Sequence, residues 1–98
     1  MIAEIQCLTT PRGTAADPYK HIEAAIAVIE RSGLTFEVDA LGTTIEGEPD
    51  AVWATLRQAH DACIASGADS VVTILKVAQA RPEAPQSSIA SLTGKFRS

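Results

Sequence analysis

The sequence has few aromatic side chains, few cysteines, few basic residues and no long apolar run. Phe, Trp and Tyr make up 4% of its 98 residues, and Lys and Arg number 8 against 12 acidic residues. The scattered basic residues and the net charge of −4 exclude the pattern typical of nucleic-acid binding. No apolar run approaches the roughly 20 residues that span a membrane, and the N-terminal MIAEIQC lacks the basic region of a signal peptide.

The two cysteines, Cys7 and Cys63, have no CxxC or cysteine–histidine spacing of the kind that binds zinc. We therefore predict free buried thiols rather than a disulfide, which fits a protein of the reducing cytoplasm. Apolar residues make up 46% of the chain, which is typical of a folded protein. A single domain over residues 1–98 is expected. A chain this short buries only about 60–65% of its unfolded surface, so self-association would add useful burial.

The first half of the chain predicts a strand, a helix and a hairpin. Residues 2–10 are rich in strand formers and end at Pro11-Arg12-Gly13. Asp17-Pro18 has the sequence of a helix start, apolar residues follow at helical spacing, and Ser32-Gly33 predicts the stop. Residues 34–40 alternate between apolar and polar side chains, and residues 43–47 can pair back after Gly42.

The second half predicts a helix, a strand and a short terminal helix. Glu48-Pro49-Asp50 predicts a helix start, and Gly67 predicts its end. Residues 70–78 form an apolar strand, and residues 87–96 favour a short helix capped by Ser87 or Ser88. The order βαββαβ predicts an α+β, ferredoxin-like fold, with a four-stranded antiparallel sheet and two helices on one face.

Both faces of the last predicted strand are mostly apolar, although two helices can cover only one face of the sheet. A second copy of the chain is the simplest cover for the other face, which predicts a homo-oligomer. The alternative is that the terminal segment folds over this face.

No residue pattern indicates catalysis. His21 and His60 are expected to be solvated on helix surfaces, and the sequence has no Ser–His–Asp order, HExxH motif or metal-spaced carboxylate cluster. TPRGT, residues 10–14, is too short for a phosphate loop and predicts a turn. We expect no catalytic residue, no bound metal and no cofactor.

The stretch GTTIEGEPD, residues 42–50, concentrates hydroxyl and carboxylate groups. Thr43 and Thr44 would point to opposite faces of a short strand, and Glu46 would share the face of Thr44, as would Glu48 if the strand extends that far. A hydroxyl and a carboxylate on one face suit a cationic ligand with N–H donors. In the other interpretation, the glutamates are solvated. Asp50 is assigned to the helix dipole.

TPRGT, ERSGLTFEV and ALGTTIEGEPDAVW together resemble the small thiamine-binding protein family over about nine-tenths of the chain. The resemblance implies dimers that assemble into tetramers, and binding of thiamine or its hydroxymethylpyrimidine part without known catalysis. The chain departs from the family pattern at the end of the last predicted strand. There VAQA separates Lys76 from Arg81, and the acidic residues that the family has at this place are missing. The ligand-binding residues predicted from the resemblance and from side-chain chemistry together are Thr10, Pro11, Ser32, Thr43, Thr44, Glu46 and Glu48, with Phe36 and Trp53 as aromatic candidates for the ring walls.

Two other functions fit the same sequence. One is a small-molecule enzyme of the dimeric ferredoxin-like kind, which would need a histidine, arginine or tyrosine on an inward strand position. The other is a structural or regulatory oligomer. The residues do not separate thiamine, its phosphate esters and the free pyrimidine as ligands, nor transport, salvage, storage and sensing as roles.

Overall fold

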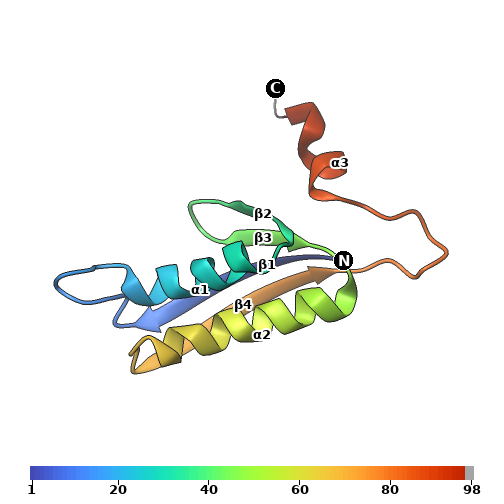
Figure 1. Ribbon diagram of the computed structural model, residues 1–98. Helices are drawn as coiled ribbons and strands as arrows, with labels where there is room; N and C mark the ends of the chain where they lie inside the picture. The colour runs from blue at the N-terminus through green and yellow to red at the C-terminus, as the bar shows by residue number, and fades with distance from the viewer. Residues whose placement is uncertain (97–98) are drawn as a thin grey trace.

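Four antiparallel strands form one open sheet, and two long helices cover one of its faces (Figure 1). The computed structural model describes residues 1–96, and the last two positions of the predicted domain lie outside the described residues. The elements are β1 (Ile2–Thr10), α1 (Lys20–Arg31), β2 (Thr35–Val38), β3 (Thr43–Glu46), α2 (Pro49–Ala65), β4 (Ser70–Ala78) and α3 (Ile89–Thr93), followed by a 3-10 turn at Gly94–Phe96.

The strand order β2-β3-β1-β4 is that of the predicted ferredoxin-like fold, so the predicted fold class is confirmed. The predicted bounds of β1 and β4 are also correct, as is the start of α2 at Pro49. Among residues 1–96, no helix is long and apolar enough to cross a membrane.

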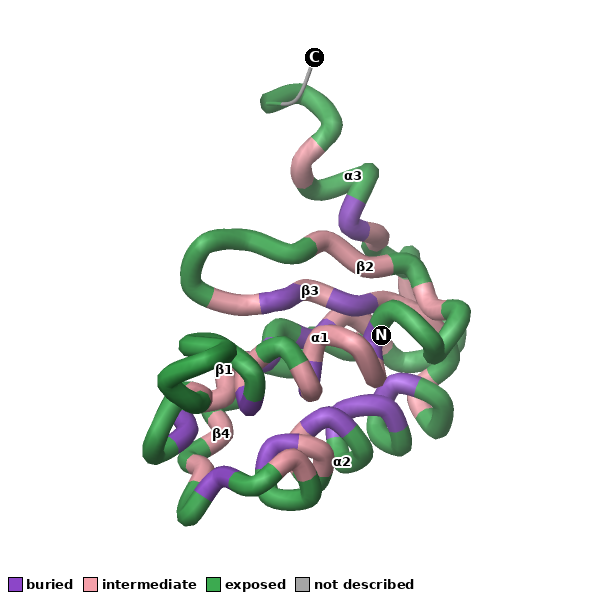
Figure 2. The backbone as a smooth tube through the Cα atoms, turned by 60° about the vertical axis from the view of Figure 1, so that its left-hand side comes forward, coloured by how far each residue is buried: buried purple, intermediate pink, exposed green. Residues whose placement is uncertain are grey.

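The hydrophobic core lies between the sheet and the two long helices (Figure 2). Alternate residues of β1 and β3 point into it, because successive strand side chains face opposite sides of a sheet. One stripe of each helix completes the core at helical spacing. The fully enclosed residues are Ala3, Ile5, Ala25, Ile29, Ile45, Val52, Leu56, Ala59 and Cys63.

The predicted start of α1 was wrong by two residues. The helix begins at Lys20, because the segment before it forms a turn in which the Asp17 carbonyl accepts hydrogen bonds from the Thr14 and Lys20 amides. The Thr14 hydroxyl accepts from the Asp17 amide, so Thr14 and not Asp17 supplies a side-chain cap to the backbone here. The predicted helix ends are correct: Gly33 and Gly67 follow α1 and α2 with positive φ angles of 78° and 117°.

The C-terminal arm, residues 79–96, leaves the end of β4 and carries α3 away from the two long helices (Figure 1). Ser88 caps α3 by accepting from the Ser91 amide, as predicted, and Ile89 is buried beside β3. The arm does not cover the sheet face opposite the helices where the end of β1 pairs with the start of β4. There Leu8, Val72 and Ile74 remain 46%, 61% and 47% exposed.

Candidate functional site

A mismatch in strand length creates a pocket on the helix side of the sheet. The nine-residue strand β1 pairs with β4 along its whole length, but β3 pairs with β1 only from Ile2 to Ile5. Beyond Ile5, no described strand occupies the β3 side of β1. The first turns of α1 therefore lie over a gap, which the turn between β2 and β3 closes only in part.

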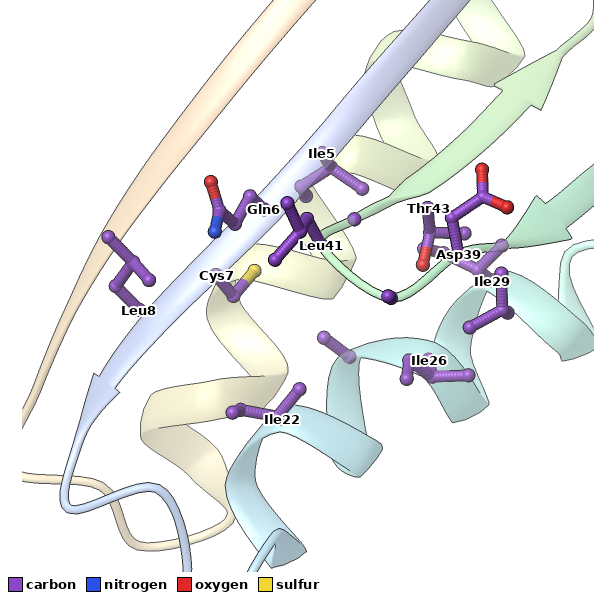
Figure 3. Close-up of a pocket in the computed structure, with 14 residues that line it drawn as sticks. Ile5, Gln6, Cys7, Leu8, Ile22, Ile26, Ile29, Asp39, Leu41 and Thr43 are labelled. Carbon is purple, nitrogen blue, oxygen red and sulfur yellow. The ribbon is translucent and has the colours of Figure 1, made fainter.

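The pocket has a volume of about 230 Å³ and is lined by α1, β1 and the β2–β3 turn (Figure 3). Its walls are mainly aliphatic, with Ile22, Ile26 and Ile29 of α1 on one side and Leu41 of the turn near β1. Leu41 is 80% exposed, so this side chain is available to a ligand at the pocket mouth. The turn is held by a 2.8 Å hydrogen bond from the Asp39 amide to the Gly42 carbonyl.

A small number of polar groups interrupt this apolar surface. Asp39 and Thr43 lie on either side of the β2–β3 turn, and Cys7 comes from β1. The Thr43 residue is buried, and no side-chain hydrogen bond within residues 1–96 engages its hydroxyl. The unpaired edge of β1 adds backbone N–H and C=O groups, which are strong hydrogen-bonding groups. Apolar walls with a few placed polar groups are typical of small-molecule sites.

Thr44 and Glu46 lie on the opposite face of the sheet. Thr43 and Ile45 point toward the helices and are buried, whereas Thr44 and Glu46 are half-buried on the open face, as the sequence predicted. In register, Thr44 is flanked by Glu4 of β1 and Glu37 of β2, so this part of the open face is acidic. Lys76 contacts Glu4 at 4.0 Å across β1 and β4. One molecule bound to a single chain cannot contact the side chains of both Thr43 and Glu46, because the sheet separates them.

Four further predicted residues lie at element ends. Glu48 is not on the strand, which ends at Glu46; it is the exposed residue before α2. Ser32 caps α1, donating to the Ile29 carbonyl and accepting from the Leu34 amide, so a structural role accounts for it. Thr10 and Pro11 are exposed at the end of β1, where the Thr10 carbonyl accepts from the Asp69 amide.

The two aromatic candidates occupy different environments. Phe36 of β2 packs against the core and is half-buried. Trp53 of α2 is 48% exposed and lines a second, shallower groove between α2 and β4, together with His60 and Thr73. Neither residue lines the pocket under α1. That pocket therefore has no aromatic wall among the residues that the structure describes.

The expectation for the histidines was wrong for His21 and incomplete for His60. His21 is only 3% exposed, and its Nδ1 donates to the Ser66 hydroxyl at 2.7 Å, because that hydroxyl donates onward to the Cys63 carbonyl. The sequence could have predicted this burial, because His21 lies at helical spacing on the same buried face of α1 as Ala25 and Ile29. His60 is half-buried and hydrogen-bonds to Thr73.

Sequence reasoning did not predict Asp39 or Cys7 as pocket residues, because the pocket depends on how far β3 extends along β1. Cys7 could be placed on an inward strand position, but nothing local marks the strand edge as unpaired. Within residues 1–96, no group of three or more His, Cys, Asp or Glu side chains could hold a metal ion. Cys7 and Cys63 are free thiols, as predicted, but only Cys63 is buried; Cys7 is half-buried.

The family model described as thiamine-binding protein matches residues 4–95. The chain belongs to the thiamine-binding protein family. The resemblance seen in TPRGT, ERSGLTFEV and ALGTTIEGEPDAVW is thus confirmed over nearly the whole chain. The match covers all of β2, β3 and the turn that forms the pocket.

Two curated proteins are similar to this chain over much of its length. A UPF0045 protein of Methanocaldococcus jannaschii is 31% identical over 77 residues, which are 79% of this chain and 74% of that protein. A UPF0045 protein of Clostridium perfringens is 34% identical over 59 residues, and the matched part spans only 62% of that relative's length and 60% of this chain.

Two solved structures share the fold. A Bacillus cereus domain of unknown function superposes with a TM-score of 0.79 at 31% identity, covering 99% of this chain and 91% of that one. A proposed thiamine biosynthesis or salvage protein of Thermotoga maritima superposes with a TM-score of 0.75. It is 21% identical, with coverage of 99% and 100%, and this likeness concerns the fold alone.

Proposed function

We propose that this protein binds thiamine, or the hydroxymethylpyrimidine part of thiamine, in the pocket between α1 and the β2–β3 turn, without catalysing a reaction. The observation that carries the proposal is this pocket itself: an aliphatic cavity with one buried hydroxyl, from Thr43, in a chain of the thiamine-binding family. An aminopyrimidine presents N–H donors and ring-nitrogen acceptors along one edge. The unpaired backbone of β1 and the Thr43 hydroxyl offer complementary groups.

The charges around the pocket favour the free vitamin over its phosphate esters. Among the residues that the structure describes, Asp39 is the one charged residue in the lining, and it can face the positively charged thiazolium ring. Arg12, Lys76 and Arg81, the basic residues considered for a phosphate, do not line the pocket. A diphosphate would therefore bring negative charge beside a carboxylate. We expect thiamine and hydroxymethylpyrimidine to bind more tightly than thiamine diphosphate.

We also propose a homo-oligomer in which a second copy covers the open sheet face. The exposed Leu8, Val72 and Ile74 form an apolar patch that the chain's own C-terminal arm leaves uncovered. In such an assembly Thr44 and Glu46 would lie near the copy-to-copy boundary. A ligand held there, by the hydroxyl and carboxylate that the sequence singled out, is the competing location for the thiamine site.

Calorimetric titration of the wild-type protein with the three ligands tests the function, and two variants separate the locations. Thr43→Val removes the pocket hydroxyl while keeping the side-chain shape. A lost neutral hydrogen bond costs about 0.5–1.5 kcal/mol, so we expect roughly threefold to tenfold weaker thiamine binding. Glu46→Gln is the matched change on the other face and should leave binding unchanged.

The opposite pattern would place the site on the open face. There a charge-assisted hydrogen bond of about 1.5–3 kcal/mol would be lost in Glu46→Gln, which predicts a loss of about tenfold or more. Absence of binding by all three ligands to the wild-type protein would refute the proposed function. Turnover of any of the three would refute its non-catalytic character.

A further inference from the structure

A groove between α2 and the edge strand β4 lies apart from the pocket under α1. Its volume is about 220 Å³, and its lining residues are Trp53, Leu56, Arg57, His60, Thr73 and Leu75. Among the residues that the structure describes, none lines both cavities. Leu75 pairs with Ile5, which faces the helices, so the groove is on the helix side of the sheet. It is therefore separate from the open face that a second copy is proposed to cover.

The α2 wall of the groove combines an aromatic ring, a cation and an imidazole. Trp53, Arg57 and His60 follow at intervals of four and three residues, so they lie on one face of the helix. Trp53 is exposed, which leaves its ring accessible to a ligand. Arg57 contacts Asp61 through Nε at 3.7 Å, and both side chains are mostly exposed. Such a pair is weak, so the guanidinium can bind another carboxylate through its two terminal nitrogens.

Hydrogen bonds within the protein fix the orientation of His60. The Thr73 hydroxyl donates to Cys7 Sγ at 3.7 Å, so His60 Nδ1, which contacts the same hydroxyl, donates to it. In the neutral imidazole Nε2 is then an acceptor. Within residues 1–96 no buried imidazole nitrogen lacks a hydrogen-bond partner, so Nε2 is open to solvent. A molecule in the groove can therefore donate an O–H or N–H to it.

The two cavities carry charges of opposite sign. With the imidazole neutral, Arg57 is the one charged residue among the described residues that line the groove, whereas the pocket under α1 has Asp39. A carboxylate is therefore attracted to the groove and a cation to the pocket. The indole of Trp53 favours a flat aromatic partner for stacking. Charge and shape together indicate an aromatic acid as the ligand of the groove.

We propose that the groove is a second small-molecule site, which binds a single-ring aromatic carboxylate with a hydroxyl or amino group opposite the carboxylate. The carboxylate binds Arg57, the ring stacks on Trp53, and the hydroxyl or amino group donates to His60 Nε2. Residues three apart on a helix have Cβ atoms about 5–6 Å apart, which is comparable with the span of one substituted benzene ring. The groove volume also admits a molecule of this size.

Trp53 is the only tryptophan in the chain, so its indole N–H resonance in an NMR spectrum reports directly on the groove. Titration of the wild type with 4-hydroxybenzoate should shift this resonance, with a Kd of about a millimolar or below. Benzoate lacks the hydroxyl donor, and 4-hydroxybenzamide lacks the negative charge. Each should bind about threefold to tenfold more weakly than 4-hydroxybenzoate. Thiamine should leave the resonance in place, because Trp53 does not line the pocket under α1.

Two variants and a control assign the contacts. Arg57→Gln should weaken binding of 4-hydroxybenzoate about threefold to tenfold and leave that of 4-hydroxybenzamide unchanged. Arg31→Gln makes the same change of charge at the exposed end of α1 and should have no effect. In His60→Asn the side-chain amide can keep the hydrogen bond to Thr73 but has no Nε2. This variant should bind 4-hydroxybenzoate no more tightly than benzoate.

An unmoved Trp53 resonance in the wild type at millimolar 4-hydroxybenzoate would overturn the second site. Equal affinities for the acid and the amide would overturn the role of Arg57, as would equal losses in Arg57→Gln and Arg31→Gln. Displacement of 4-hydroxybenzoate by thiamine would show one shared site instead of two. The wild-type comparisons stand even if a variant does not fold. The proposed thiamine binding is decided separately, by the calorimetric titration.

Discussion

Replacing Leu56 with alanine tests the assignment of the core-facing side of α2. Leu56 is 2% exposed and packs in the core with Val52, Ala59 and Cys63. Truncating a buried leucine costs about 2–5 kcal/mol, part of it from the cavity left behind. Leu56 also borders the groove that Trp53 lines, so neighbouring side chains can partly fill the cavity. We therefore expect a loss in the lower half of that range.

The loss should be large against the total stability of the domain. A domain of this size is stable by about 5–15 kcal/mol. Each kcal/mol lowers the Tm of a chain of about 100 residues by about 4–8 °C, which predicts a fall of about 10–25 °C. Melting followed by circular dichroism measures it, with all variants at one protein concentration, because association shifts the apparent stability.

Gln58→Ala is the matched control, since Gln58 is exposed on the same helix. A surface substitution of this kind changes the free energy of unfolding by less than about 0.5 kcal/mol. The assignment of the core-facing side of α2 is wrong if Leu56→Ala melts like the wild type, or if Gln58→Ala lowers the free energy of unfolding more than Leu56→Ala does. Because Leu56 does not line the pocket under α1, residual folded protein should bind thiamine with unchanged affinity.

Three further predictions concern the first turn, the start of α2 and the assembly. Gly13→Ala should cost about 1–3 kcal/mol in denaturant unfolding, because its new Cβ would clash with the Asp17 carbonyl oxygen; Gly94→Ala, whose Cβ would meet no distant part of residues 1–96, should cost nothing. Asp50→Asn should change stability by about 0.3–1 kcal/mol at most and leave thiamine affinity unchanged, as expected for an exposed carboxylate in the first turn of α2. Light scattering should give a multiple of the 10.3 kDa chain mass, and a monomer mass at micromolar concentration would contradict the proposed oligomer.

The sequence by itself determined the elements whose signals are local. Apolar alternation and flanking turns set β1 and β4, and Pro49 and Gly67 bound α2 closely. The order of these elements leaves few ways to pair the strands, so the fold class followed. The sequence also predicted that Thr43 and Thr44 point to opposite faces of the sheet, because successive side chains on a strand alternate. Asp17 was misplaced because a proline after an N-cap residue is equally compatible with a turn that precedes the helix.

Only the tertiary structure decided the pocket and the burial of His21. The pocket exists because β3 stops opposite Ile5 while β1 continues to Thr10, and the length of a pairing depends on two distant segments at once. In the same way, His21 becomes buried only where α1 meets the end of α2, beside Ser66. Periodicity in a sequence reports which face of an element is apolar. It does not report where a neighbouring strand ends, and that end is what leaves the space under α1.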